Sequence, residues 1–333
     1  MNYQRANLLC TQIDNSPLNN AFKCVSNPGR IKNLPEFEPE LRRGHHLKFD
    51  IVMWTKNGES TLPVVLKRLE TQLEEKGAVE QKIVVDDHSD DDTVSIAASF
   101  GWIVVPNKGN GISDGANTAL KLVKTECFAS FEQDIFLSDD WLARVPPKLE
   151  SEKIAAVSGM RYPSVPIGLA KLMRYTDLRG IQDEDTPWRK SKNPGAFYLG
   201  KTLDNTIYKT SVLRKMGGFP NVGNAGMDVI LAFNYARIGY QWAVDYEVKS
   251  VHLRRNLVQE LKHQYFYGKQ VFKISQRTGM PTESFRLMTR LLKSPLTAFR
   301  AVVITKEPTI MYIHPLMIYY FTKGIFEGRK LRN

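Results

Sequence analysis

Four short apolar runs, each followed by polar residues and then by a helix-like segment, constrain the fold of this chain most. They lie at residues 49–54, 81–85, 102–105 and 127–131. Strands that alternate with helices form a parallel sheet with crossover helices, and such sheets bind ligands at the carboxyl ends of their strands. We therefore predict an α/β fold that begins near Lys48, with a binding site where the polar residues after these runs come together.

Helical patterns separate the four runs. One helix is predicted to end near Glu75 and could be capped by Ser60, and a second runs from Thr93 through Phe100. A third, from about Ala116 to Val123, follows a glycine-rich loop. Each of these helices would cross over a face of the sheet and lead into the next parallel strand.

Length, cysteine content and hydropathy set the protein class. A chain of 333 residues accommodates one large α/β domain and an appendage. The three cysteines are an odd number without CxxC spacing, which argues against a disulfide framework or a zinc site and favours a reducing, cytoplasmic setting. The sequence does not open on a signal pattern, and no stretch reaches the ~18 apolar residues of a spanning helix.

Acidic side chains gather after the second and fourth runs. They include Asp86, Asp87, Glu132, Asp134, Asp139 and Asp140. Two oxygen ligands on one turn suit Mg²⁺ or Mn²⁺, which can in turn hold a diphosphate, whereas an ordinary polar turn is the alternative interpretation. Glu132 and Asp134 are the preferred metal pair because they directly follow a strand; Asp139 and Asp140 are the competing pair.

Five segments between residues 48 and 253 follow one another in a set order. They are DIVMWTKNGESTL, KIVVDDHSDDDT, NGISDGANTAL, EQDIFLSDDWL and GGFPNVGNAGMDVILAFNYARIGYQWAVDYEVKSVHL. In this order they resemble glycosyltransferase family 2, the inverting nucleotide-sugar-dependent enzymes. The resemblance implies a GT-A fold, with a Rossmann-like nucleotide-binding sheet and an acceptor-binding half. It also implies Mn²⁺ or Mg²⁺ as cofactor and a UDP- or GDP-linked sugar as donor.

The same resemblance assigns four residues to the donor nucleotide. Asp87 would accept a hydrogen bond from the base, with Trp54 and Lys56 lining the same pocket. Glu132 would hold the ribose or complete the metal shell, although the family has Asp at this position and Glu has a longer arm. The aromatic residue that often stands at the Lys56 position is absent, so the base is left open.

The resemblance assigns metal binding and catalysis to three further residues. Asp134 would bind the metal, and His252 would approach the diphosphate or the metal from the far side. Asp228 would be the general base that deprotonates an acceptor hydroxyl for an in-line displacement with inversion. A helix N-cap is the alternative for Asp228, and a structural role is the alternative for His252. Because Met227 replaces an acid beside Asp228, little elevation of its pKa is expected.

The last quarter of the chain is basic and amphipathic. From Lys249 onward it holds sixteen Lys and Arg against four Glu. Apolar and aromatic residues recur at helical spacing in 256–278, 285–300 and 309–321. Such helices favour a membrane surface with anionic head groups and hence a lipid-linked acceptor. Packing on the catalytic domain or dimerisation are the alternatives.

These patterns predict an N-terminal extension at 1–47, a GT-A domain at 48–255 and a membrane-surface tail at 256–333. The predicted activity is hexosyl transfer to an acceptor hydroxyl or lipid phosphate, the acceptor being a saccharide or polyprenyl-linked. Nucleotidyl transfer is disfavoured because residues 55–62 lack a glycine- and Arg-rich loop. A catalytically inactive or non-enzymatic basic module that binds membrane or nucleic acid is the other alternative; no nucleic acid is expected because no binding signature is present.

Overall fold

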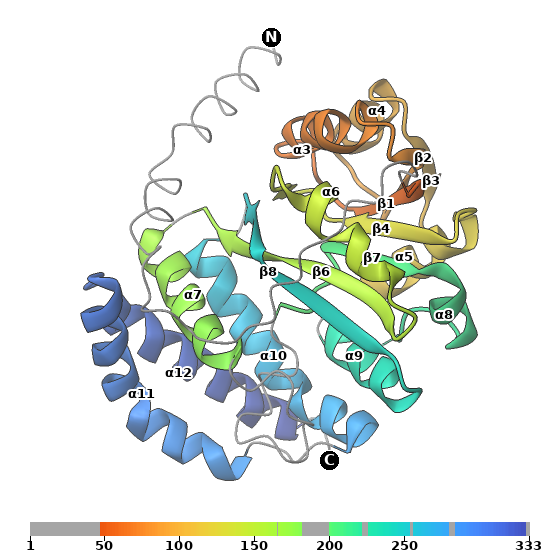
Figure 1. The fold of residues 1–333 in the computed structure, drawn as a ribbon. Coiled ribbons are helices and arrows are strands. Elements are labelled where there is room, and N and C mark those ends of the chain that lie inside the picture. Colours follow the sequence, from red (N-terminus) through yellow and green to blue (C-terminus); the bar gives the residue numbers. More distant parts are fainter. Residues whose placement is uncertain are drawn as a thin grey trace.

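One mixed sheet organises the molecule, with its strands in the order β3-β2-β1-β4-β7-β6-β8-β5 (Figure 1). The structure is a computed structural model that describes residues 47–164, 166–181, 200–221, 226–253, 256–279 and 284–330, of which 177–181 and 284–290 are described without side chains. The predicted extension at 1–47 lies outside the described residues except for Leu47.

The four apolar runs form the four parallel strands that the sequence predicts. They are β1 (Phe49–Thr55), β2 (Val79–Asp86), β3 (Ile103–Pro106) and β4 (Cys127–Phe131). Side chains alternate between the two faces of the sheet. In β1, Val52 and Trp54 enter one core cluster, whereas Ile51 and Met53 enter the other. The sheet is therefore covered on both faces, as expected for a crossover fold.

The second connecting helix begins at Thr93 as predicted, whereas the first and third begin at slightly different residues than predicted. The connecting helices are α3 (Leu62–Leu69), continued by the π-helical turn η1 (Glu70–Glu74), α4 (Thr93–Ser99) and α5 (Gly111–Leu122). Ser60 does not cap α3, because Thr61 takes the N-cap position and its hydroxyl donates to the carbonyl of Gln133. Helix α5 starts five residues before Ala116, where the carboxylate of Asp87 accepts a hydrogen bond from the backbone N–H of Gly111. A carboxylate at a helix N-terminus stabilises the first turn.

The second half of the sheet contains antiparallel pairs that the sequence pattern did not predict. Its strands are β5 (Ile135–Phe136), β6 (Ile154–Pro163), β7 (Asn205–Lys209) and β8 (Gln241–His252). Strand β7 is antiparallel to β4 and to β6, and β5 is antiparallel to β8. The helices in this half are α6 (Trp141–Arg144), the 3₁₀ turn η2 (Pro146–Glu150), α8 (Thr210–Lys215) and α9 (Met227–Arg237).

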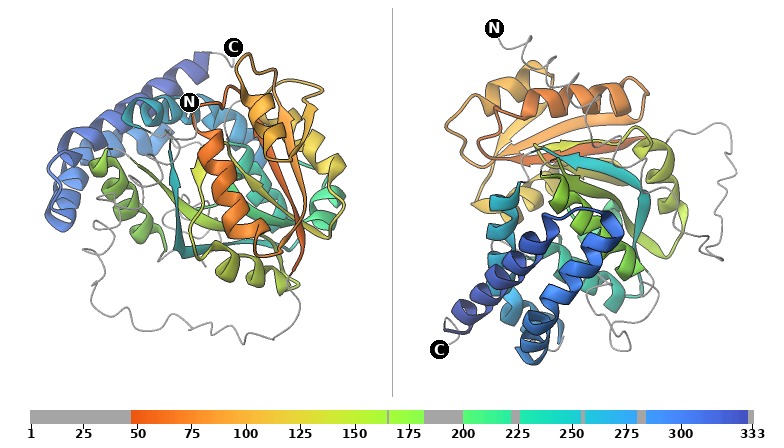
Figure 2. Two further views of the ribbon diagram at one scale, coloured as in Figure 1. Left: turned by 90° about the horizontal axis from the view of Figure 1, so that it is seen from above. Right: turned by 90° about the vertical axis from the view of Figure 1, so that its left-hand side faces the viewer.

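Four helices gather on the side of the sheet away from α3 and α4 (Figures 1 and 2). They are α7 (Ile167–Ile181), α10 (Leu257–Thr278), α11 (Ser284–Thr305) and α12 (Ile310–Lys330). Helices α10 and α12 approach so closely that a Cβ atom at Gly268 would overlap the carbonyl oxygen of Phe321, and one at Gly324 would overlap that of Tyr265. Ile274 of α10 also belongs to a core cluster of the sheet. No helix in the described ranges combines the length and apolarity needed to cross a membrane.

Candidate active site

A cavity of about 480 Å³ lies at the carboxyl ends of β1, β2 and β4. Seven of its lining residues are the site residues predicted from the sequence: Trp54, Lys56, Asp87, Glu132, Asp134, Asp228 and His252. They come from segments that span two hundred residues of the chain. The structure thus brings all seven to one cavity, and their individual roles stay predictions.

Asp87 is held firmly at one end of this cavity. Its Oδ1 accepts hydrogen bonds from the side-chain amide of Asn107 at 2.7 Å and from the backbone N–H of Gly111 at 3.0 Å. Its Oδ2 lies 3.8 Å from Nζ of Lys56. The neighbouring Asp86 instead accepts from the backbone N–H and hydroxyl of Ser89, so it stabilises the turn after β2. Only the second Asp of the pair therefore faces the cavity.

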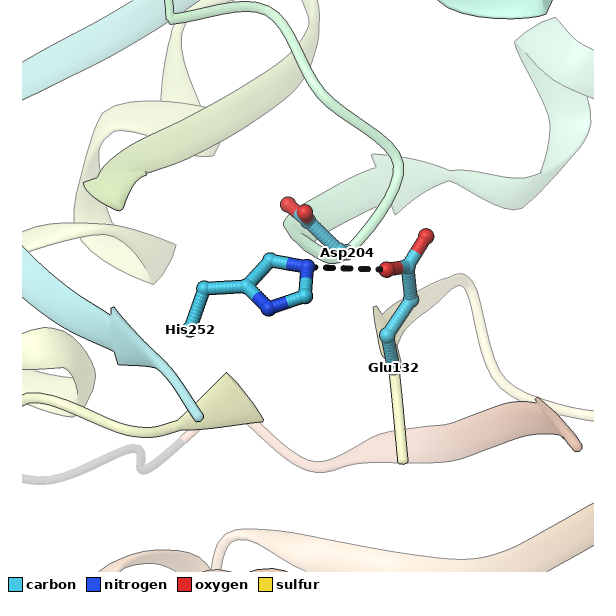
Figure 3. A group of neighbouring side chains, drawn as sticks. All are labelled: Glu132, Asp204 and His252. Atoms are coloured by element: carbon cyan, nitrogen blue, oxygen red, sulfur yellow. Dashed lines mark ion pairs between the residues drawn. The ribbon is translucent and has the colours of Figure 1, made fainter. Parts of the chain in front are cut away.

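Three side chains could hold a metal ion together. One ligand atom each from Glu132, Asp204 and His252 lies within 4.8 Å of the others (Figure 3). The dashed line in Figure 3 marks the ion pair between Nε2 of His252 and Oε2 of Glu132, which are 3.8 Å apart. Two carboxylates and an imidazole are ligands that Mn²⁺ accepts, and Mg²⁺ also binds carboxylate oxygen. The donor set thus fits the cofactor expected from the sequence.

Asp134 lies beside this group but is not a member of it. Its Oδ2 is 3.6 Å from Nδ1 of His252, the imidazole nitrogen opposite the one that faces Glu132. A carboxylate on the second nitrogen of a ligating His fixes the orientation and tautomer of the ring. Glu132 thus belongs to the group that could hold a metal, whereas Asp134 faces the other imidazole nitrogen of His252. The predicted metal-binding role of Asp134 stays a prediction.

The strand register explains why these residues meet. Phe131 pairs with Asn205 in the antiparallel β4–β7 ladder, so Glu132, after β4, lies beside Asp204, before β7. Ile135 pairs with His252 in the β5–β8 ladder, which places His252 next to Asp134. Asp204 was not among the residues predicted from the sequence, because the strand it precedes reads Asn-Thr-Ile-Tyr-Lys and forms no apolar run.

The competing acidic pair takes no part in the cavity. Asp139 forms an ion pair with Arg68 at 2.8 Å and its side chain is 83% exposed. Asp140 occupies the N-cap position of α6 and its carboxylate accepts a hydrogen bond from Ser138. Neither residue lines the cavity. They lie between β5 and α6, outside the cavity. The choice of Glu132 and Asp134 as the metal pair stays a prediction.

Asp228 is the second residue of α9, because Gly226 takes the N-cap position. It is therefore not the N-cap considered as an alternative. Its Oδ1 accepts from the backbone N–H of Val229 at 2.9 Å, and its Oδ2 accepts from the hydroxyl of Tyr267 at 3.4 Å. Burial raises the pKa of the Asp228 carboxyl, and the negative charge of Asp204 raises it further. The expectation of an ordinary pKa, based on Met227, was wrong because burial rather than an adjacent acid is the main cause.

A buried ion pair between Arg161 of β6 and Asp204 forms the far wall of the cavity. Although burial lowers the pKa of Arg161, the carboxylates of Asp204 and Glu132 raise it overall. The pKa of Glu132 is raised by burial first and then by the charges of Asp204 and Asp134. The cavity is thus rich in carboxylates whose mutual repulsion a divalent cation would relieve.

Helix α10 contributes three lining residues that sequence reasoning missed, His263, Phe266 and Tyr267. They belong to the segment predicted as a membrane-surface tail. The alternative that these helices pack on the catalytic domain is the one that α10 follows. Aromatic residues at helical spacing indicated an amphipathic helix correctly, but they could not show which partner its apolar side would contact.

A sequence model described as glycosyl transferase family 2 matches residues 50–215, which include β1 to β4, β7 and much of the cavity wall. The chain belongs to glycosyl transferase family 2. Among its family relatives is the glycosyltransferase AglE of Haloferax volcanii, 24% identical over 193 residues, which are 56% of this chain and 61% of AglE. The chain thus spans about three fifths of the length of this curated relative.

Two solved structures show the fold of this family 2 chain. The mannosyltransferase PcManGT from Pyrobaculum calidifontis, in complex with GDP-Man and Mn²⁺, has a TM-score of 0.60 at 16% identity and covers 98% of this chain and 99% of its own. Glucosyl-3-phosphoglycerate synthase from Mycobacterium tuberculosis, in complex with Mn²⁺, UDP and phosphoglyceric acid, has a TM-score of 0.53 at 17% identity over 71% and 80%. The predicted GT-A fold is confirmed, with helices after the sheet.

Proposed function

We propose that the chain transfers a hexose from a nucleoside-diphosphate sugar to an acceptor hydroxyl, with inversion at the anomeric carbon and with Mn²⁺ or Mg²⁺ as cofactor. The observation that carries this proposal is the composition of one cavity. Three kinds of side chain line this space. Asp87 is a carboxylate suited to contact the base, Glu132 and Asp204 belong to a group that fits a metal ion, and Asp228 is a half-buried carboxylate. These are the separate requirements of donor binding, leaving-group stabilisation and proton removal.

The donor would lie along the parallel half of the sheet. Asp87 would receive a hydrogen bond from the base on Oδ2, since its Oδ1 already accepts two hydrogen bonds. Trp54 lines the same end, and its buried indole N–H has no hydrogen-bond partner within the described part of the chain. Support for a GDP- or UDP-linked hexose comes from the two structural neighbours, whose complexes contain GDP-Man or UDP.

Glu132, Asp204 and His252 would hold the metal ion, with Asp134 orienting His252 or binding directly as predicted from the sequence. The bound ion would neutralise negative charge on the departing nucleoside diphosphate. The carboxylates of Glu132 and Asp204 lie at the edge of the sheet, where the diphosphate would bind. Mn²⁺ or Mg²⁺ is present in the complexes of structural neighbours.

Asp228 would take the proton from the acceptor hydroxyl. The charges around it favour a neutral acceptor, because Asp204 and Glu132 lie near Asp228 and Arg161 is already paired with Asp204. An acceptor phosphate would bring its own negative charge against these carboxylates. The acceptor we propose is therefore a hydroxyl of a saccharide, which can itself be attached to a lipid, rather than a lipid phosphate.

We further propose that α11 rests on an anionic membrane surface and brings the site to a lipid-linked acceptor. Its side chains at i, i+4, i+7 and i+11 form an exposed apolar stripe, which we call the α11 stripe: Leu292, Leu296, Phe299 and Val303. Lys293 and Arg300 are exposed on the same helix. Apolar side chains beside cations are complementary to the boundary between acyl chains and acidic head groups.

Product analysis tests the proposed activity. The full chain is incubated with Mn²⁺, a mixture of labelled UDP- and GDP-hexoses and a saccharide acceptor library, and the products are identified by mass spectrometry and anomeric proton NMR. We expect one hexose to be transferred with inverted configuration, and transfer to stop when EDTA is added. Asp139→Asn is the matched control, because that acid lies outside the cavity. Transfer by Asp228→Asn at the wild-type rate would place the base elsewhere.

A further inference from the structure

Helix α10 reaches the reacting end of the cavity through one polar side chain. The hydroxyl of Tyr267 donates to Oδ2 of Asp228 at 3.4 Å, whereas Oδ1 is held by the backbone N–H of Val229 at 2.9 Å. The two contacts come from different elements, α9 and α10, and together they fix the rotation of the carboxylate. Catalytic hydrogen bonds are often long in unliganded enzymes and tighten in the complex.

We propose that Tyr267 is a positioning residue, which aims the Asp228 carboxylate at the acceptor hydroxyl. This inference rests on the proposed function of Asp228 as general base. It also makes α10 part of the catalytic machinery rather than of a separable anchor. A carboxylate that accepts two hydrogen bonds keeps its orientation. Its remaining lone pairs then point into the cavity and would receive the acceptor proton at a fixed position.

Two close contacts hold α10 against its neighbours near Tyr267. Gly226, two residues before Asp228, has a φ of +88° and approaches Ile274 so closely that a Cβ would lie 2.6 Å from its Cδ1. Gly268, the residue after Tyr267, allows the backbone of α12 to touch α10. Helix α10 thus approaches α9 and α12 closely near Tyr267, and a larger side chain at either glycine would displace it.

Several charged and titratable groups face Asp228 and decide how its protonation responds. Arg161 on β6 and the hydroxyl of Tyr267 on α10 favour the charged carboxylate, and burial opposes it. The carboxylates at the ends of β4 and β7, Glu132 and Asp204, disfavour it. Because the Tyr267 hydrogen bond lowers the pKa of Asp228, its removal must raise that pKa and shift activity to higher pH.

Tyr267→Phe tests the proposal, and Tyr265→Phe is its matched control on the same helix. The Tyr265 hydroxyl donates to Glu327 on α12, outside the cavity lining. For Tyr267→Phe we expect kcat to fall about tenfold, KM for the donor to stay unchanged, and the acidic limb of the rate profile to move to higher pH. Tyr265→Phe should leave all three unchanged.

A second measurement does not depend on turnover. Carbon-13 NMR of labelled Asp carboxyls, with the Asp228 signal assigned from Asp228→Asn, gives the pKa of Asp228 at a temperature where both proteins are folded. A higher pKa in Tyr267→Phe than in wild type supports the contact even if the wild type transfers no sugar, in which case the proposed function alone fails. An unchanged pKa, or a loss of kcat without any shift of the pH profile, would overturn the positioning role.

Discussion

The extra methylene of Glu132 matters because of where the imidazole of His252 stands. Oε2 of Glu132 lies 3.8 Å from Nε2 of His252, whereas Oδ2 of Asp134 lies 3.6 Å from Nδ1 of the same ring. One ring nitrogen can then face a metal while the other is held by a carboxylate. An Asp at position 132 would be one methylene shorter, so the metal group would lose reach on that side.

Asp204→Ala should weaken Mn²⁺ binding, because it removes one of three grouped ligands and leaves Arg161 without its ion-pair partner. We expect at least tenfold weaker binding, the lower bound typical when a metal-site partner is lost. Isothermal titration with Mn²⁺ in the presence of a nucleoside diphosphate measures it. Asp139→Ala, which removes an exposed acid outside the cavity, is the control. Equal affinities in both variants would remove Asp204 from the metal group.

Asp228→Asn should retain donor binding and lower kcat by about 10²–10⁴-fold, the range for loss of a general base. The wild-type rate should fall as pH decreases through the raised pKa of Asp228, since the base must be deprotonated to act. The acidic limb therefore lies above the pH at which an ordinary Asp titrates. Steady-state rates against pH report it, and a profile that stays flat down to the ordinary Asp pKa of about 3.9 contradicts the assignment.

Residues that directly follow an apolar run were predictable from the sequence. Lys56, Asp87 and Glu132 each come after a parallel strand. Because parallel strands that alternate with helices end at the same edge of a sheet, the three residues were expected to lie close together. Arg161 and Asp204 were not predictable in this way. Their places depend on the antiparallel entry of β7 beside β4 and β6, which no local pattern reports.

At the scale of elements, the first four strands were predicted within two residues at each end. The short β5 and the antiparallel direction of β7 were not, because two residues carry no alternating pattern and the direction of a strand depends on its tertiary pairing. Helix α10 was recognised as amphipathic, but its role as a cavity wall depends on tertiary contacts with α9 and α12. Amphipathicity shows that the apolar face of a helix is covered, but it does not identify the element that covers it.

Gly324→Ala should separate α10 from α12, because the new methyl group would overlap the carbonyl oxygen of Tyr265. Overpacking against backbone costs about 1–3 kcal/mol, so the free energy of unfolding should fall by that amount. Denaturant unfolding of the full chain measures the change. Phe326→Ala on the same helix is the control, since that side chain is 57% exposed. An unchanged unfolding free energy for Gly324→Ala would show that the two helices are not in close contact.

At the scale of the whole molecule, the predicted division at residue 255 separates parts that share one cavity. The ends of the strands carry the side chains proposed to bind the donor and the metal, and α10 carries Tyr267 and its neighbours. The α11 stripe lies on the group of helices opposite α3 and α4 (Figure 2). A membrane under α11 would therefore contact the same group of helices as α10, which lines the cavity.

Replacing Leu292 and Phe299 with Ser should weaken binding to anionic liposomes by more than tenfold, because each exposed side chain contributes about 1.5–3 kcal/mol when fully buried. Flotation of the full chain with phosphatidylserine vesicles at low and high salt measures it. Binding should decrease with salt, as expected for basic side chains on acidic head groups. Val258→Ser, an exposed apolar position on α10, is the control. Equal flotation of all three proteins would exclude α11 as the contact, and no flotation of the wild type would exclude the membrane.

Thermal unfolding with UDP, GDP or CDP, with and without Mn²⁺, tests most directly whether this cavity binds a nucleoside-diphosphate sugar through a divalent metal. Ligand at 100 times its dissociation constant stabilises the folded state by about 2.7 kcal/mol. We predict that one diphosphate raises the melting temperature only when Mn²⁺ is present, that Asp228→Asn keeps this effect, and that Asp134→Ala and Asp204→Ala lose it. Stabilisation that is the same with and without Mn²⁺, or that survives in both of the last two variants, would contradict the account.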